Sequence, residues 1–123
     1  MKFKKHFTPH EANKTLPLVK RIVKDILDTG HEINSLVTFL GDETEDHPQI
    51  SQLVDQMNSY FSELEEIGCF YKDWNFRIGL VDFPAIINGE EVFLCWRSDE
   101  LDIKYYHSIE SGYAGRKSIG SKK

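Results

Sequence analysis

The chain has 123 residues, 40% of them hydrophobic, which fits one ordinary globular domain and excludes a disordered or collagen-like chain. Its two cysteines are too few for a disulfide framework or a four-cysteine zinc site, and no stretch approaches the ~20 apolar residues that a membrane-spanning helix needs. The net charge of −5 argues against nucleic acid as a partner. No apolar segment follows the N-terminal lysines, so we expect a cytoplasmic protein without a signal peptide or membrane contact.

The first predicted helix begins with the sequence Thr-Pro-His-Glu at residues 8–11. This is the pattern of a capping box with proline at the first helical position. A second proline, Pro17, disfavours helical backbone at the residue before it. We therefore expect a short first turn that ends near Asn13 and a new start near Thr15.

Apolar residues then recur at alternating steps of three and four over residues 19–40 and again over 50–67, which is a seam of coiled-coil type. The only missing step falls at Gly30. An acidic, proline-closed segment at 41–48 separates the two seams, and Gly68 follows the second as a C-terminal cap. Two such helices joined by a short loop predict an antiparallel helical hairpin over residues 1–68.

After Gly68 the apolar period changes from 3.6 to two, which predicts strands at 69–72, 81–87, 90–97 and 103–107. Asn88-Gly89 is the strongest signal for a two-residue hairpin turn. The predicted fold is therefore α+β and single-domain, with the helical hairpin packed on one face of a small antiparallel β-meander. The meander has three or four strands over residues 69–110, and a C-terminal tail covers 111–123.

The two-residue turn also determines which side chains share a face of the sheet. An entirely apolar face, expected to lie against the helices, comprises Val81, Phe83, Ala85, Val92, Leu94 and Trp96. The opposite, mixed face comprises Leu80, Asp82, Pro84, Ile86, Glu91, Phe93, Cys95 and Arg97. An open face with that much apolar surface is rarely left in water, so we expect a homodimer contact through it or through the outer side of the helices.

Several motifs in the chain resemble a family of small bacterial proteins, the domain of unknown function 2203. They are Gly-Leu-Val-Asp-Phe-Pro at 79–84, Leu-Cys-Trp-Arg at 94–97, Tyr-His at 106–107 and Gly-Tyr-Ala-Gly-Arg at 112–116. The opening at residues 7–17 is also similar to that family. Since the family has no assigned activity, the resemblance implies a fold and a location rather than a function.

The candidate binding site comprises Asp82, Cys95, His107 and Arg116 from these motifs, together with Glu100 from the loop after residue 97. The carboxylate of Asp82, the thiol of Cys95 and the imidazole of His107 suit zinc or iron, and Glu100 or Glu110 could complete such a set. The length of the loop after residue 97 is ambiguous by one residue, and one residue flips every side chain of the next strand. The sequence therefore leaves open whether His107 shares a face with the other two.

Three other interpretations compete with the metal site. Cys95 can be a buried small hydrophobe, Asp82 a carboxylate held by backbone amides and His107 a satisfied sheet histidine. Alternatively, Cys95 is a nucleophile with His107 as base and Asp82 as orienter, although nucleophiles usually occupy a sharp turn or a helix start rather than mid-strand. Arg116 can bind an anion, but an ion pair with Asp82 or Asp73 is the expected role.

The sequence best fits a non-catalytic binding or protein–protein interaction module without a cofactor, partnered by a second copy or another protein. The alternative is a small metalloprotein or enzyme that uses Asp82, Cys95 and His107 on the mixed face.

Overall fold

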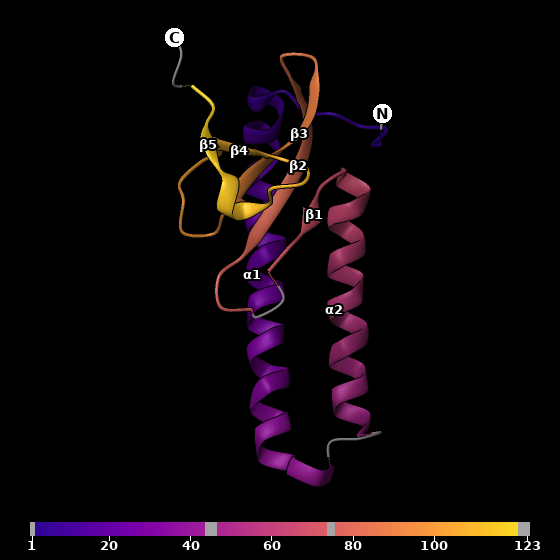
Figure 1. The fold of residues 1–123 in the computed structure, drawn as a ribbon. Helices are drawn as coiled ribbons and strands as arrows, with labels where there is room; N and C mark the ends of the chain where they lie inside the picture. Colours follow the sequence, from indigo (N-terminus) through magenta and orange to yellow (C-terminus); the bar gives the residue numbers. More distant parts are fainter. Residues whose placement is uncertain (1, 44–46, 74–75, 121–123) are drawn as a thin grey trace.

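The computed structural model describes residues 2–43, 47–73 and 76–120, and it has the predicted α+β architecture (Figure 1). Part of the acidic loop, residues 44–46, and the last three residues lie outside this description. The helical elements are α1 (Pro9–Leu40), the 3-10 turn η1 (Gly41–Glu43), α2 (Pro48–Ile67) and the 3-10 turn η2 (Tyr113–Gly115). The strands are β1 (Phe70–Tyr71), β2 (Leu80–Ile87), β3 (Glu90–Arg97), β4 (Tyr105–Ser108) and β5 (Lys117–Ser118).

The five strands form one antiparallel sheet in the order β1-β2-β3-β4-β5. The expected count of three or four strands was too low, because the C-terminal tail turns back and pairs with β4. Tyr105 lies opposite Ser118, and Tyr106 lies opposite Lys117. This pairing covers one edge of β4 that would otherwise expose unpaired backbone groups.

Helix α1 begins at the predicted capping box but does not break at its internal proline. Thr8 Oγ1 accepts from the Glu11 amide at 3.1 Å, and Glu11 Oε1 accepts from the Thr8 amide at 3.0 Å. The predicted restart near Thr15 was wrong, because the helix continues through Pro17. Proline in a helix interior costs about 3 kcal/mol. Burial of apolar side chains on either side of it, Leu16 and Val19, offsets that cost.

The register of the β2–β3 hairpin is the predicted one over all eight pairs, from Leu80 opposite Arg97 to Ile87 opposite Glu90. The predicted apolar face is buried in the core together with the seam residues Val19, Val23, Ile26, Met57 and Leu64. Trp96 is only 1% exposed, as expected, and its Nε1 donates to the Glu100 carbonyl at 2.9 Å. The core therefore lies between the sheet and the hairpin.

The mixed face of the sheet, expected to be open in the monomer, is partly covered by the chain's own N-terminal segment. The chain before α1 crosses it, and the Phe3 ring lies 5.2 Å from the Phe93 ring. Glu91 anchors this segment by accepting from the amides of Lys2 and Phe3 and contacting His6 Nε2 at 2.7 Å. Phe93 is consequently 5% exposed, and among the apolar side chains of this face Ile86 stays substantially exposed. This face therefore offers less exposed apolar surface for a dimer contact than the sequence predicted.

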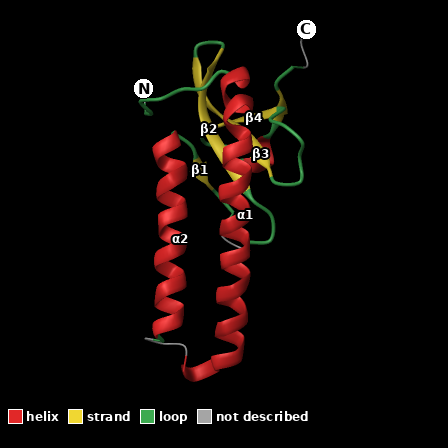
Figure 2. Cartoon of the chain, turned by 180° about the vertical axis from the view of Figure 1, so that it is seen from behind, coloured by secondary structure: helices red, strands yellow, loops and turns green. Residues whose placement is uncertain are grey.

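The helical hairpin is longer than the sheet that it supports. In Figures 1 and 2 the sheet lies beside the upper part of α1, and both helices continue well below it. No α1 residue beyond Gly30 is buried. Gly30 itself is where the Phe76 side chain reaches the helix: a Cβ there would lie 2.7 Å from Phe76 Cγ. This close approach explains why the apolar seam skips that position.

Candidate functional site

The structure answers the question that loop length left open, because His107 lies on the mixed face with Asp82 and Cys95. Asp82 of β2 lies opposite Cys95 of β3, which in turn lies opposite Tyr105 of β4. His107 is two residues beyond Tyr105 and therefore points to the same side. The strand predicted at 103–107 begins two residues late, at Tyr105, because the Ile103 amide donates to Asn13 of α1 at 2.8 Å.

Asp82, Cys95 and His107 form one buried cluster whose candidate ligand atoms all lie within 4.8 Å of one another. His107 Nε2 is 3.2 Å from Asp82 Oδ1, and its Nδ1 is 2.7 Å from the Ser108 carbonyl oxygen. The exposed fractions of Asp82, Cys95 and His107 are 5%, 1% and 2%, respectively. Of the sequence-predicted site residues, these three are brought together.

The environment of His107 favours its charged form. Burial alone lowers its pKa, but the hydrogen bonds to Asp82 and to the Ser108 carbonyl, together with the Asp82 charge, outweigh burial and raise the pKa above its ordinary value. Asp82 thus interacts with a histidine rather than with Arg116, which was its expected cationic partner.

The thiol of Cys95 is held in its protonated form. Burial is the main cause and the neighbouring Asp82 carboxylate the second, and together they raise the pKa of Cys95 to about 12. A thiol of this kind is a poor nucleophile at neutral pH. The arrangement therefore does not favour the interpretation of Cys95 as a catalytic nucleophile.

The cluster lies at the wall of a cavity of about 250 Å³ on the mixed face. Lys72 and Phe93 line it from the sheet side, while Ile109, Gly112 and Tyr113 line it from the segment after β4. The Lys72 ammonium lies 5.2 Å from the centre of the Phe93 ring, which places a positive charge near the cluster. A small ligand, water or ion therefore has space beside the three side chains.

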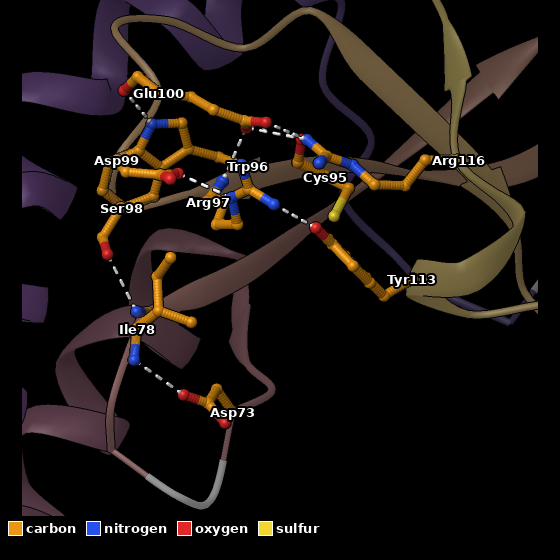
Figure 3. A network of polar contacts seen from close by, with 11 residues as sticks. Asp73, Ile78, Cys95, Trp96, Arg97, Ser98, Asp99, Glu100, Tyr113 and Arg116 are labelled. Carbon is orange, nitrogen blue, oxygen red and sulfur yellow. Dashed lines mark hydrogen bonds and ion pairs between the residues drawn. The ribbon is translucent and has the colours of Figure 1, made fainter.

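Glu100 and Arg116 form a second polar group next to the cluster (Figure 3). Arg116 Nη2 donates to both carboxylate oxygens of Glu100 at 2.7 Å, and Glu100 Oε1 also accepts from the Arg97 amide. The expected pairing of Arg116 with Asp82 or Asp73 was wrong, since Asp73 accepts from the Ile78 amide instead. Glu100 is thereby engaged by arginine and is not part of the cluster.

Two tyrosines that the sequence did not single out as site residues hold Arg116 in place. Its guanidinium carbon lies 4.1 Å from the Tyr105 ring centre and 4.9 Å from the Tyr113 ring centre. Arg97 donates to the Tyr113 hydroxyl, so the tail is connected to β3. Stacking of guanidinium on aromatic rings stabilises both. Tyr113 lies within the motif at 112–116, which was the available signal.

The other expected ligand, Glu110, is exposed and lies outside the cluster.

None of the helices in the described residues is long and apolar enough to cross a membrane.

These features define a small α+β protein in which a long helical hairpin supports a five-stranded sheet with a buried Asp-Cys-His cluster on its far face. The model of the family described as "Uncharacterized conserved protein (DUF2203)" matches residues 5–119, so the chain belongs to that family. Neither the curated proteins nor the solved structures contain a match to this chain.

Proposed function

We propose that this protein is a non-catalytic protein–protein interaction module whose contact surface is the part of the helical hairpin beyond the sheet. The observation that carries this proposal is the exposure of apolar side chains there: 85% for Phe39, 39% for Val37 and 41% for Val54. Apolar side chains left exposed at one end of a molecule typically mark an interface where they lie on one face.

Helical periodicity indicates which side of the hairpin is uncovered. Residues seven apart lie on one face of a helix. Val54 precedes Phe61 by seven, and the Phe61 ring stacks on Tyr71 of β1 at 5.6 Å. Val37 follows Gly30 by seven, and Gly30 meets Phe76. Val54 therefore lies on the helix face that β1 covers at Phe61, and Val37 on the helix face that the Phe76 side chain covers at Gly30.

The charge distribution supports a second copy of the chain as the partner. Residues 1–30 contain seven Lys and Arg residues against three acids, whereas residues 31–70 contain nine acids and no Lys or Arg. Within one chain, the acids at the end of α2 (Glu63, Glu65 and Glu66) lie at the same end of the hairpin as the basic start of α1 (Figure 1). Two hairpins side by side in opposite directions would place the acids at the far end of one copy (Glu32, Asp42, Glu43 and Asp55) near the basic start of α1 in the other. This arrangement is an isologous two-fold contact, the commonest kind in homodimers.

The enzyme alternative has less support. A buried Cys95 with a raised pKa is unsuited to nucleophilic catalysis at neutral pH. Arg116 donates to both carboxylate oxygens of Glu100, which suits a structural role for the pair.

Sedimentation velocity over a concentration series, at low and at high salt, tests the proposal. We expect a concentration-dependent dimer that Val54→Ser weakens and that high salt weakens further. Leu101→Ser is the matched control, because Leu101 is 82% exposed but lies at the sheet end of the molecule. A monomer at high micromolar concentration, or a dimer that both variants weaken equally, would contradict the proposed contact.

A further inference from the structure

We propose that Asp82, Cys95 and His107 bind one divalent transition-metal ion of the zinc type on the mixed face of the sheet. The site is separate from the hairpin surface, so its test is independent of self-association.

The donor set fits such an ion in both kind and spacing. Thiolate and imidazole are ligands that zinc and related ions prefer, while a carboxylate completes mixed sites of this kind. The three candidate ligand atoms already lie within 4.8 Å of one another, and the Asp82–His107 contact is 3.2 Å. Ligands around one tetrahedral ion at ~2.0–2.3 Å from each are themselves ~3–4 Å apart. Small adjustments of the three side chains would therefore bring their ligand atoms to the spacing that one tetrahedral ion requires.

The hydrogen bond on the other side of the His107 ring selects the correct nitrogen. A carbonyl oxygen can only accept, so Nδ1, at 2.7 Å from the Ser108 carbonyl, carries a proton and donates. Nε2 then faces Asp82 Oδ1 with a lone pair for a ligand or with a second proton. Metal-ligating histidines commonly donate their other ring N–H to a backbone carbonyl in this manner.

Charge balance permits a divalent ion in this buried site. The Cys95 thiolate and the Asp82 carboxylate supply two negative charges, and a divalent ion neutralises both. Binding therefore leaves no uncompensated charge in the interior, and the proton of the thiol is released when the metal binds.

The surroundings leave one coordination position for a small molecule. Glu100 is engaged by Arg116, so the residues that the structure describes supply three ligands. The cavity of about 250 Å³ beside the cluster has space for a water molecule as the fourth. The thiolate selects against Mg²⁺ and Ca²⁺, which prefer oxygen ligands.

Cobalt titration tests the site directly. The chain, purified without a metal-affinity tag and dialysed against a chelator, is titrated with Co²⁺ while absorbance and proton release are recorded. We expect one Co²⁺ per chain, a thiolate-to-cobalt charge-transfer band, and displacement of the ion by Zn²⁺. Cys95→Ser should abolish the band, and His107→Gln should weaken binding by more than the ~10–100-fold that loss of an outer-shell partner costs.

The second cysteine provides the matched control. Cys69 is buried as well, but its Sγ lies 3.5 Å from the Leu64 carbonyl and outside the cluster. Cys69→Ser should therefore keep both the band and the stoichiometry. If Cys95→Ser fails to fold, this control still identifies the ligand. The chain has two cysteines, so a band that persists in Cys69→Ser must arise from Cys95. No Co²⁺ bound at micromolar concentration, or a band that depends on Cys69, would overturn the proposal.

Discussion

The upper and lower halves of the helical hairpin have the same kind of apolar seam but different surroundings. In the upper half, Val19, Val23 and Ile26 of α1 are at most 1% exposed, because they pack against α2 and the sheet. In the lower half, Ile33 is only partly buried and Val37 is 39% exposed. Figure 1 shows the reason, since the sheet ends partway down the helices.

The same comparison separates stability from recognition. Seam residues under the sheet gain free energy from burial on folding. Seam residues below it gain that energy only if a partner covers them, which is the physical basis for the proposed contact. Substitutions in the two halves should accordingly differ in what they change.

The largest effect is expected for Trp96→Ala, on the sheet face that covers the upper half of the hairpin. Truncation of a core Trp removes its packing and leaves a cavity, which costs about 3–5 kcal/mol in the free energy of unfolding. Urea denaturation of the variant and the wild type measures the difference. Phe39→Ala is the control from the lower half, and a surface residue of this kind should change the free energy by less than ~0.5 kcal/mol. Similar losses in the two variants would contradict the division into halves.

Gly30→Ala tests the boundary between the halves. The added Cβ would lie 2.7 Å from Phe76 Cγ and 2.9 Å from Phe76 Cβ, so the loop that carries Phe76 must shift. Overpacking of this kind costs ~1–3 kcal/mol, against a gain of ~1 kcal/mol in helix propensity. We expect a net loss of stability in thermal melts, whereas Ser35→Ala, exposed in the same helix, should be neutral or stabilising. A stabilised Gly30→Ala variant would show that Phe76 moves away freely.

Glu91→Gln tests the anchoring of the N-terminal segment over the mixed face. The hydrogen bond from His6 lowers the pKa of Glu91 to about 2, with the Lys2 and Phe3 amides contributing, although partial burial opposes the shift. A carboxylate with a lowered pKa stabilises the fold at a pH above its pKa in the unfolded chain, which is near 4.5. This stabilisation is lost as the pH falls toward 2. Stability should therefore depend less on pH between 4.5 and 2 in the variant. An unchanged acid limb in pH-dependent melts would contradict the anchor.

The smallest effect on folding is expected for Val54→Ser in the lower half. Because Val54 is 41% exposed, its loss should change the free energy of unfolding of the monomer by less than about 0.5 kcal/mol. Denaturation at a concentration where the chain is monomeric measures this value. A larger loss would mean that Val54 supports the hairpin itself, and its effect on self-association would then have no bearing on a contact surface.

Local sequence determined much of this protein. The capping box at residues 8–11, the glycine cap at 68 and the Asn88-Gly89 turn act through neighbouring residues, so their consequences could be predicted without a partner segment. The turn also determined the β2–β3 register, and with it the buried Trp96 and the Asp82–Cys95 pair. Pro17 was the exception. Its local preference to interrupt the helix was outweighed by the burial of the surrounding side chains in the core.

Tertiary structure alone decided the features in which distant segments meet. The face of His107 depends on a loop whose length sequence patterns leave ambiguous by one residue, and the Ile103–Asn13 hydrogen bond across 90 residues resolves it. The pairing of Arg116 with Glu100 depends on where the tail crosses the sheet. Candidate site residues can thus be named from their chemistry, but which of them meet depends on long-range contacts that no local pattern encodes.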